Sequence, residues 1–274
     1  MDAFETLERD GLILLGCGKM GSAMLEGWLS AGLPPQAIHI QDPNPSPRLN
    51  ALAGEGLHLN AAMPAAPALA LIAVKPQMME AALPTAQTLG GGDTLILSIA
   101  AGTPIARFED TFGPGTPIVR AMPNTPAAIG KGITALVGST AATPAHLSLA
   151  ETVLSAIGQT VRLDSEDQID AVTALSGAGP AYVFHLIDCL AAAGIAEGLP
   201  PELAMQLAMA TVSGAGQLAE AADETPEQLR INVTSPNGVT QAGLEVLMDP
   251  KTGLPPLTAR TLEAAVARSR ALRV

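Results

Sequence analysis

A glycine-rich segment near the start of the chain has the spacing of a phosphate-binding turn. It reads Gly16-Cys-Gly18-Lys-Met-Gly21, follows the apolar run at 12–15 directly, and leads into an amphipathic stretch at 22–30. Glycines between a strand and a helix allow a tight turn and close approach of the backbone to a pyrophosphate, which the helix N-terminal amides then bind. A glycine turn with a purely structural role is the alternative. The positions expected to bind a dinucleotide are Gly16, Gly18, Lys19, Met20 and Gly21.

The residues after the second expected strand bear on which dinucleotide binds. Asp42 occupies the place where an acid hydrogen-bonds the ribose 2′-hydroxyl of NAD. Asn44, Ser46 and Arg48 follow at once and are suited to the 2′-phosphate of NADP, with Asn60 as a further donor after the next short strand. These two signals conflict. We expect NADPH to be preferred and NADH to remain active.

Two further segments leave strand ends at the same expected sheet edge, where open α/β sheets bind ligands. The first is Ala73-Val-Lys75-Pro76, in which Lys75 is suited to the cofactor's ribose or phosphates, although a solvated loop lysine fits this position nearly as well. The second is the MPNTP segment at 122–126, whose prolines fix a backbone that presents amides and carbonyls. We expect Ala73, Lys75, Pro76 and Asn124 to line the cofactor.

Two loops in the second half of the chain combine helix ends with small or hydroxylated residues. The first reads LSGAGP at 175–180, and its composition predicts that one helix stops at the glycines and another begins at the proline. The second reads VTSPNGVT at 233–240, which predicts a helix start with three hydroxyl groups. Such a helix start can hold a carboxylate without a cation. Simple helix capping is the alternative interpretation of each loop.

The elements that must position these residues follow two patterns. Up to residue 163, apolar β-rich runs alternate with helical patterns, as in stacked βαβ units covered by helices on both faces. From 164 on, only helical patterns occur, beginning with a capping box at Ser165 and Gln168. We therefore expect an α/β fold: a Rossmann-like, doubly wound, mainly parallel sheet as a dinucleotide-binding domain at 1–163, and an all-helical substrate-binding and dimerisation domain at 164–274. The expected strands are 12–15, 37–40, 69–74, 94–99, 117–121, 134–137 and 160–163, and the later helices are 165–175, 180–197, 201–222, 226–232, 238–248 and 256–271.

The composition excludes several classes of protein. With a net charge of −12 and few aromatic residues, the 274-residue chain has neither a basic surface nor stacking platforms for nucleic acid. Its acidic start lacks the features of a targeting signal, and its longest apolar stretch, 181–196, is shorter than the ~20 residues that cross a bilayer. We expect a cytoplasmic protein with no membrane partner. Cys17 and Cys189 are expected to be reduced thiols, and no metal site is expected, because His185 and Cys189 lack further ligands nearby.

The second half also differs from the first in charge and in side-chain size. It carries −8 of the net charge and has no Lys or Arg between Arg162 and Arg230. An anionic substrate bound there must therefore be held by hydrogen bonds from neutral donors. The helical segments of this half are rich in alanine and glycine, which bury little volume in a bundle made from one copy. We expect this half to complete its core against a second copy in a homodimer. A monomer packed on its own first domain is the alternative.

Five motifs together resemble the pyrroline-5-carboxylate reductase family. They are G-x-G-x-M-G at 16–21, AVKP at 73–76, MPNTP at 122–126, LSGAGPAY at 175–182 and VTSPNGVT at 233–240. The last two are the specific ones, and the five span the chain. The chain departs from the family pattern at Asn237, where a second glycine is usual, and at Val239, where threonine is common. Because asparagine tolerates a positive φ, the loop can still form.

The resemblance implies reduction of 1-pyrroline-5-carboxylate, a small imine carboxylate, to proline by NAD(P)H, the last step of proline biosynthesis. It implies an interlocked helical dimer, which in this family often assembles further into a decamer. It also implies that Ser235, Gly238 and Thr240 hold the substrate's carboxylate or ring nitrogen. The residues that would shape the pocket beside the nicotinamide are Ser176, Gly177, Gly179 and Pro180.

The charged residues of the chain fit reduction of an imine better than reduction of a ketone. A ketone needs a proton donor such as a held lysine, yet the only lysine after 131 is Lys251, in an expected loop. A protonated cyclic imine accepts hydride directly, so positioning supplies most of the catalysis, with Thr240 as the catalytic proton relay to the ring nitrogen. Tyr182 and His185 are the alternative acids. The rival functions are reduction of another imine or a small aldehyde acid, and dinucleotide sensing without chemistry.

Overall fold

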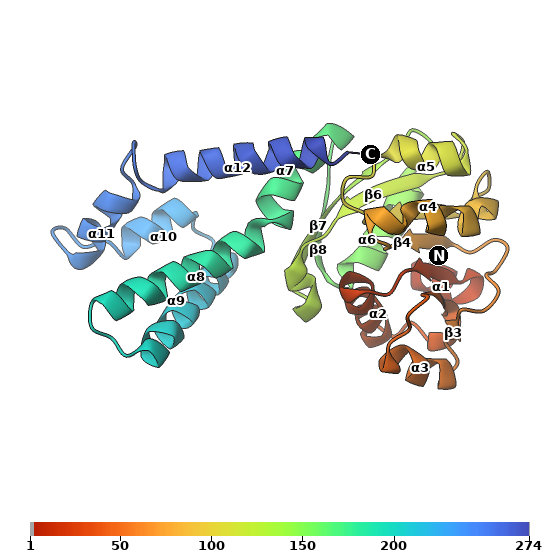
Figure 1. Cartoon of the computed structure of the whole chain (residues 1–274), viewed down its shortest axis with the longest axis horizontal. Helices are drawn as coiled ribbons and strands as arrows, with labels where there is room; N and C mark the ends of the chain where they lie inside the picture. The colour runs from red at the N-terminus through yellow and green to blue at the C-terminus, as the bar shows by residue number, and fades with distance from the viewer. Residues whose placement is uncertain (1–2, 274) are drawn as a thin grey trace. The chain divides into compact units, whose positions relative to one another are not determined.

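The computed structural model describes residues 3–273, which belong to two compact units (Figure 1). The first unit runs to Gly177 and takes in the end of the chain from Val266, and the second is Ala178–Ala265. Strands give way to helices after residue 162, but the contacts divide the chain later, because Ile169 still belongs to the core of the sheet. The domain boundary expected at 163 from the sequence pattern stays a prediction.

One eight-stranded sheet forms the frame of the first unit, with the strand order β3-β2-β1-β4-β5-β6-β7-β8. Neighbouring strands pair in parallel except β6 and β7, which are antiparallel. The strand order reverses direction between β1 and β4, so the fold is the expected doubly wound, mainly parallel sheet. The strands are β1 (Leu12–Leu15), β2 (Ile38–Gln41), β3 (His58–Leu59), β4 (Leu69–Ile72), β5 (Leu95–Ser98), β6 (Ile118–Met122), β7 (Gly132–Gly138) and β8 (Gly158–Arg162).

Helices cover both faces of this sheet, which explains why its strands are continuous apolar runs. On β1, Leu12 and Leu14 belong to the core of one face together with Trp28, while Ile13 belongs to the core of the other face together with Phe108. All five side chains are fully buried. The helices of this unit are α1 (Ala3–Asp10), α2 (Lys19–Ser30), α3 (Pro47–Gly54), α4 (Met79–Ala82), α5 (Ile105–Phe112), α6 (Pro144–Ser155) and α7 (Ile169–Val172).

The helical run that begins at Glu166 stops at Gly177, and α8 (Gly179–Ala196) begins after a bend at Ala178, so the predicted helix stop at the glycines of the 175–180 segment is confirmed. α7 passes into a π-helical turn, Thr173–Gly177, and α8 follows with Pro180 in its first turn. Pro180 has no N–H to donate, and its place in the first turn of α8 is one where no intrahelical partner is needed. By length and composition alone, Glu166–Ala196 is long and apolar enough to cross a membrane, and 6 % of its apolar stretch is buried. A single such helix is weak evidence for a membrane span.

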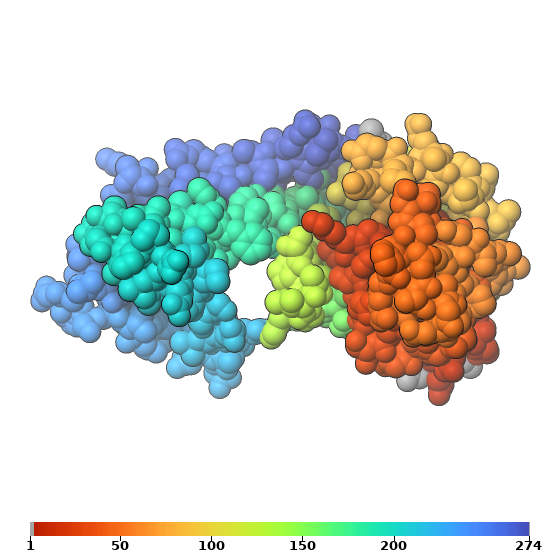
Figure 2. Space-filling view, turned by 60° about the horizontal axis from the view of Figure 1, so that its bottom comes forward, coloured from red at the N-terminus to blue at the C-terminus, as the bar shows by residue number. Residues whose placement is uncertain are grey.

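The second unit consists of α8, α9 (Pro201–Ala221), α10 (Pro226–Asn232), α11 (Val239–Leu247) and the first part of α12 (Leu254–Ala271). Its described buried apolar side chains are three alanines, Ala191, Ala204 and Ala208. Large apolar side chains are exposed instead, among them Phe184 (62 %) and Leu218 (57 %). In Figure 2, α8 and α9 (teal) lie side by side with their outer surfaces uncovered. So much exposed apolar surface around so small a core favours packing against another copy.

A buried carboxylate ties the end of the chain to the first unit. Asp170 of α7 is 2 % exposed and accepts hydrogen bonds from Ser269 Oγ (2.7 Å) and from the guanidinium of Arg273. Burial raises the pKa of Asp170, but the hydrogen bonds from these two partners outweigh burial, so its pKa lies below the ordinary value. Nearby, Arg120 Nη1 and Glu166 Oε1 are 2.5 Å apart and join β6 to the start of the same helical run.

Candidate active site

The glycine turn lies at the carboxyl end of β1, where the strand order reverses. Gly16 has a φ of +85°, and a Cβ there would lie 2.8 Å from Val74 Cγ1, while a Cβ on Gly21 would lie 2.6 Å from Gly16 O. Gly18 differs, because a Cβ there would have no atom within 4 Å. α2 begins at Lys19 without a side-chain cap, so the amides of its first turn are available. The turn thus has the space and the donors that a pyrophosphate needs.

Asp42 follows β2 and faces this turn. Its Oδ2 accepts a hydrogen bond from Cys17 N–H (2.7 Å), and its Oδ1 accepts one from Asn44 N–H (2.8 Å). Asn60 holds the backbone of Asp42 from the other side, since its Oδ1 accepts from Asp42 N–H (2.9 Å) and its Nδ2 donates to Asp42 O (2.8 Å). The side-chain amide of Asn60, which was expected to meet a 2′-phosphate, is therefore engaged by the backbone of Asp42.

Other residues expected near a 2′-phosphate also have partners within the protein. Ser46 caps α3, with its Oγ accepting from Leu49 N–H (3.3 Å). Arg48 forms a two-pronged salt bridge with Glu26 of α2, in which Nε–Oε1 is 2.8 Å and Nη2–Oε2 is 3.2 Å. Both side chains of this pair are about half exposed, so it is a weak pair, and a phosphate can compete for Arg48.

A hollow of about 480 Å³ adjoins the glycine turn. It is lined by the last residues of β1 and β2 and by the segments that follow β2, β3 and β4, including Asp42, Asn60, Val74 and Met78. Most of its other lining residues are apolar. An apolar hollow of this size with a few polar groups at its edge suits the adenosine part of a dinucleotide.

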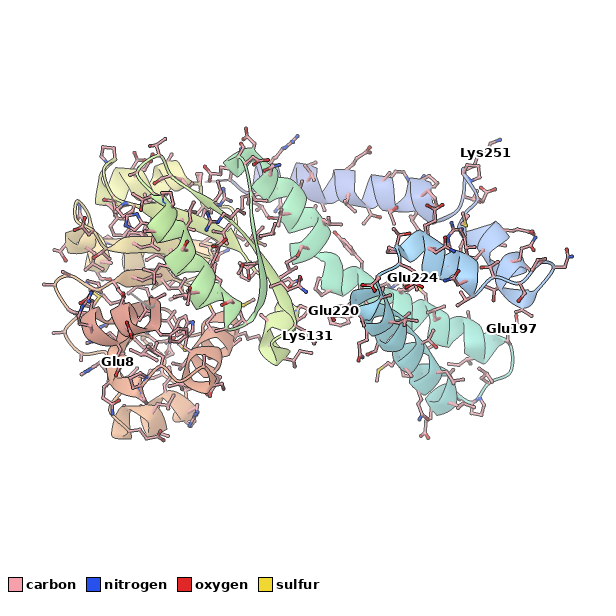
Figure 3. All side chains as sticks on the ribbon, turned by 180° about the vertical axis from the view of Figure 1, so that it is seen from behind. Glu8, Lys131, Glu197, Glu220, Glu224 and Lys251 are labelled. Carbon is pink, nitrogen blue, oxygen red and sulfur yellow. The ribbon has the colours of Figure 1, made fainter. Side chains whose placement is uncertain are left out.

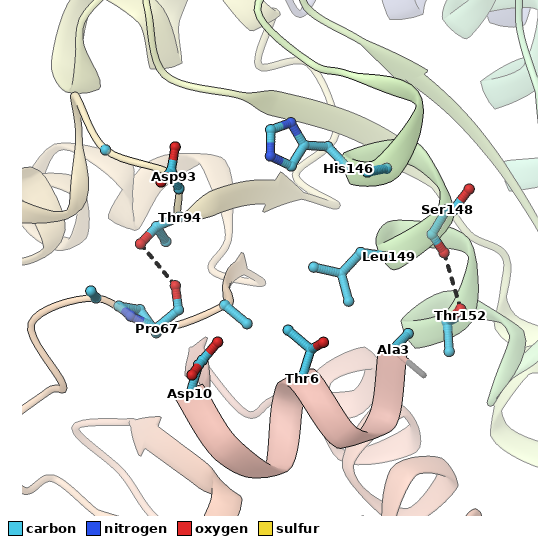
Figure 4. Close-up of a pocket in the computed structure, with 14 residues that line it drawn as sticks. Ala3, Thr6, Asp10, Pro67, Asp93, Thr94, His146, Ser148, Leu149 and Thr152 are labelled. Atoms are coloured by element: carbon cyan, nitrogen blue, oxygen red, sulfur yellow. Dashed lines mark hydrogen bonds between the residues drawn. The ribbon is translucent and has the colours of Figure 1, made fainter. Parts of the chain in front are cut away.

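A larger hollow, of about 1010 Å³, lies at the other edge of the sheet (Figure 4). Its lining residues Asp10, Ala68 and Thr94 lie just before β1, β4 and β5, which places it at the amino ends of the strands. Figure 4 also shows His146 across this hollow from the hydrogen bond that Thr94 Oγ1 donates to Pro67 O (2.8 Å). Because open α/β sheets bind their ligands at the carboxyl edge, this hollow is not the candidate active site.

The segment after β4 lies against the glycine turn, as expected for residues that leave the sheet at this edge. Ala73 N–H donates to Leu15 O (2.8 Å), and Val74 is the neighbour that a Cβ on Gly16 would meet. Lys75 and Pro76 lead into a 3₁₀ turn, Pro76–Met78, and the Lys75 side chain is exposed.

Asn124 connects the segment after β6 to the π-helical turn. Its Oδ1 accepts from Ile133 N–H (3.0 Å), and its Nδ2 donates to Ser176 Oγ (3.2 Å). A Cβ on Gly177 would lie 2.7 Å from Met122 Cε, so the glycine lets this turn pack closely against the same segment. The structure therefore brings together a residue expected at the cofactor, Asn124, and two expected at the substrate, Ser176 and Gly177. The other two residues of that loop, Gly179 and Pro180, begin α8.

In the second unit, the expected substrate loop is the start of α11. Gly238 is its N-cap residue, and no side chain caps this helix. Among the described residues, the Ser235 and Thr240 hydroxyls have no hydrogen-bond partner, and both side chains are exposed. Thr234 differs, since its Oγ1 donates to Arg230 O (2.6 Å). Helix capping thus does not account for Ser235 and Thr240, and the free hydroxyls and first amides of α11 suit an anion.

The loop before α11 takes the shape expected despite the unusual residue at 237. Asn237 has a φ of +56°, the left-handed conformation that asparagine tolerates, and its N–H donates to Gln241 Oε1 (2.7 Å). Gly238 N–H donates to Ser235 O (3.0 Å), which closes the turn. Asparagine therefore replaces glycine here without preventing the turn.

The other groups considered as acids or ligands lie elsewhere. Lys251 is in the loop between α11 and α12, as expected, and Figure 3 shows it at the edge of the second unit. Its backbone N–H donates to Asp249 Oδ1 (2.9 Å). His185 Nε2 and Cys189 Sγ are 3.6 Å apart on an exposed side of α8. Cys17 and Cys189 are both free thiols, and burial raises the pKa of the Cys17 thiol.

Sequence reasoning overlooked some of the residues that shape these sites. Val74 and Met122 limit the space around Gly16 and Gly177, and the amide of Ile133 orients Asn124. The spacing of residues in the sequence does not reveal the role of an apolar residue that follows a strand. It does not reveal the role of a backbone amide either. Their roles emerge only from the packing.

A doubly wound sheet with a glycine turn at its switch point, followed by a helical unit, defines a dinucleotide-dependent oxidoreductase. Residues 11–102 match the family described as NADP oxidoreductase coenzyme F420-dependent, and residues 166–272 match the family described as pyrroline-5-carboxylate reductase dimerisation. The chain belongs to the pyrroline-5-carboxylate reductase family.

Relatives of this family match along almost the whole chain. A pyrroline-5-carboxylate reductase of Pseudomonas aeruginosa is 37% identical over 265 residues, which are 95% of this chain and 96% of that protein. One from Synechocystis is 41% identical over 74% of each chain. Among solved structures, a pyrroline-5-carboxylate reductase from Coxiella burnetii has a TM-score of 0.90 and 31% identity, covering 97% of this chain and 99% of that one. The Plasmodium falciparum pyrroline carboxylate reductase, solved with NADP bound, has a TM-score of 0.81 and 27% identity with the same coverage.

Proposed function

We propose that this protein reduces 1-pyrroline-5-carboxylate to L-proline, with NADPH as the preferred reductant and NADH as a second one. The observation that carries this proposal is the uncapped start of α11, where the hydroxyls of Ser235 and Thr240 stand free beside unpaired helix amides. Such a helix start suits a small carboxylate without a cation. Relatives that span nearly the whole chain bear the name of this activity.

In this proposal, the first unit holds the cofactor, which supplies the hydride when bound. The amides and space around Gly18 take the pyrophosphate, and the apolar hollow beside Val74 takes the adenosine. Arg48 and Asn44 lie in the segment that would meet a 2′-phosphate. The proposed cofactor-binding residues are Gly16, Gly18, Lys19, Met20, Gly21, Asn44, Ala73, Lys75, Pro76 and Asn124, whereas Asn60 supports the site through the backbone of Asp42.

The residues around the start of α11 hold the substrate and supply the proton to its ring nitrogen. Ser235 and Gly238 bind the carboxylate, and the Thr240 hydroxyl hydrogen-bonds the ring nitrogen. A protonated imine is already an electrophile, so the protein's main task is to hold it in place and exclude water. When the neutral imine binds, the Thr240 hydroxyl gives its proton to the ring nitrogen as the carbon accepts the hydride, and it regains a proton from solvent water. Ser176, Gly177, Gly179 and Pro180 are the further residues that we propose to bind the substrate.

We also propose that the protein works as a cytoplasmic homodimer that can assemble further into a decamer. The second unit supports the dimer, because its exposed apolar side chains far outnumber its three buried alanines. The match of 166–272 to a dimerisation family supports it as well. Light scattering at micromolar concentration tests this, and a monomer there would contradict the proposed dimer.

The activity is tested by following the loss of NADPH absorbance with 1-pyrroline-5-carboxylate, a six-membered cyclic imine acid and a small aldehyde acid as substrates. We expect rapid turnover of the first. Ser235→Ala should raise the KM for substrate about tenfold, the value of one hydrogen bond to a charged group. Thr258→Ala is the matched control, since it removes a hydroxyl that bonds only backbone oxygens of its own helix, Leu254 O and Pro255 O. Turnover confined to the other substrates, or cofactor binding without turnover, would contradict the proposal.

A further inference from the structure

We propose that Asp42 is a positioning residue for the glycine turn and does not select between NAD and NADP. Its place after β2 is the one from which an acid binds the ribose of NAD. Here each of its carboxylate oxygens accepts a backbone N–H, one from Cys17 inside the turn and one from Asn44. This inference rests on the proposed use of a dinucleotide but on no particular substrate.

The contacts of Asp42 join three loops at the carboxyl edge of the sheet. Cys17 belongs to the loop after β1, Asp42 and Asn44 belong to the loop after β2, and Asn60 follows β3. Four hydrogen bonds of 2.7–2.9 Å hold these loops together, and we call this group the Asp42–Asn60 clamp. Because the clamp grips the turn at Cys17, between Gly16 and Gly18, it fixes the backbone that must approach the pyrophosphate.

The clamp explains how an acid at this position is compatible with NADP. Two N–H donors at 2.7 and 2.8 Å partly neutralise the carboxylate of Asp42, and they orient both of its oxygens towards the main chain. Each oxygen keeps a further acceptor site, but a carboxylate that is partly neutralised and directed towards the main chain gains less by binding a ribose hydroxyl. A positioning role thus resolves the conflict between Asp42 and the phosphate-binding residues after it.

The test is the binding of NADP⁺ and NAD⁺ by calorimetry, without substrate, to the full-length protein and to Asp42→Asn. The asparagine keeps the shape but can accept from only one of the two N–H groups and opposes the other with its own NH₂. We expect both Kd values to rise together by about tenfold, with their ratio unchanged within twofold. A ratio that moves tenfold towards NADP⁺ would overturn the proposal, because it would identify Asp42 as a ribose-selecting acid. Unchanged Kd values for both cofactors would overturn it as well.

Asn60→Gly tests the same clamp without removing a charge. Asn60 has a φ of +51°, which glycine adopts freely, so the backbone keeps its path while the clamp loses two hydrogen bonds. We expect both Kd values to rise by a smaller common factor, about threefold. Weaker binding of NADP⁺ alone would instead make Asn60 a phosphate ligand and contradict the clamp. This variant also keeps the proposal testable if Asp42→Asn does not fold.

A thiol readout reports the position of the turn independently of cofactor binding. The Cys17 side chain is 7 % exposed, and its backbone N–H is the group that Asp42 holds. In a Cys189→Ser background, where the exposed thiol is absent, Asn60→Gly loosens the clamp without changing the charge beside the thiol and should speed the reaction of Cys17 with a maleimide several-fold. Asn237→Gly is the matched control, because it makes the same substitution at another asparagine with a positive φ, +56°, in the second unit. A clamp role predicts no change in Asn237→Gly, and an equal rise in both variants would contradict it.

Discussion

The Asp170 tie between α7 and the end of the chain gives a stability prediction that the structure makes quantitative. Asp170→Asn keeps the volume of the side chain but leaves Arg273 facing a neutral amide. Breaking a fully buried ion pair costs about 3–5 kcal/mol. Because Arg273 is 38 % exposed and can regain water, we discount this to about 2 kcal/mol of lost unfolding free energy.

The assay is urea unfolding at one fixed protein concentration, followed through Trp28. This residue is the only tryptophan, and it is fully buried in the same unit as Asp170. Glu151→Gln is the control, since it breaks an Arg162 pair of similar geometry that is exposed and contributes about 0.2–1 kcal/mol. If Asp170→Asn destabilises the protein no more than Glu151→Gln does, the buried tie is not what holds the chain end.

The same variant predicts a pH dependence. Because the folded pKa of Asp170 is lowered, the carboxylate stabilises the fold above its unfolded pKa, and this contribution is lost as the pH falls towards the folded value. The stability gap between the wild type and Asp170→Asn should therefore be full at neutral pH and narrow only below about pH 4. If the difference in stability between the wild type and Asp170→Asn widened on acidification, the pKa of Asp170 would not be lowered in the folded protein.

Three further predictions concern the sites themselves. Gly18→Ala should leave the melting temperature of the free protein unchanged, because a Cβ there meets nothing within 4 Å. The same variant should weaken the binding of both cofactors at least about tenfold. Gly214→Ala in α9, where a Cβ is equally unhindered, is the control and should weaken the binding of neither cofactor. Thr240→Ala should lower kcat about tenfold with unchanged NADPH affinity, and full turnover would remove the proton-relay role. Glu26→Gln should free Arg48 and tighten NADP⁺ by up to about fivefold with NAD⁺ unchanged, and an unchanged NADP⁺ affinity would place Arg48 away from the phosphate.

Much of the architecture could be predicted from the sequence, because local patterns decide it. Residues that are close together in the sequence determine several of its features. Examples are the apolar run at 12–15, the glycines after it and the switch to helical patterns. The capping box at Ser165 and Gln168 is present as expected. The helix stop at 175–180 is present as expected, but the π-helical form of the last turn before it, Thr173–Gly177, could not be predicted from glycine and proline alone.

The site was predictable in its residue types but not in its partners. Asp42 and Asn60 could be singled out by their distance from the glycine turn, yet their bond to each other joins residues 18 positions apart. The same holds for Asn124 and Ser176, which tertiary packing alone brings together. Spacing can place a residue at a sheet edge, but it cannot tell which neighbour already occupies its hydrogen-bonding groups.

The central claim is reduction of a cyclic imine carboxylate, and isotope transfer tests it most directly. The protein is incubated with 1-pyrroline-5-carboxylate and NADPH that carries deuterium at the transferred position, and the product is analysed by mass spectrometry and NMR. We expect L-proline with a single deuterium on the former imine carbon, which is the ring carbon that is bonded to nitrogen but does not carry the carboxylate. Consumption of NADPH without labelled proline, or no reaction in protein that binds NADPH tightly, would contradict the account.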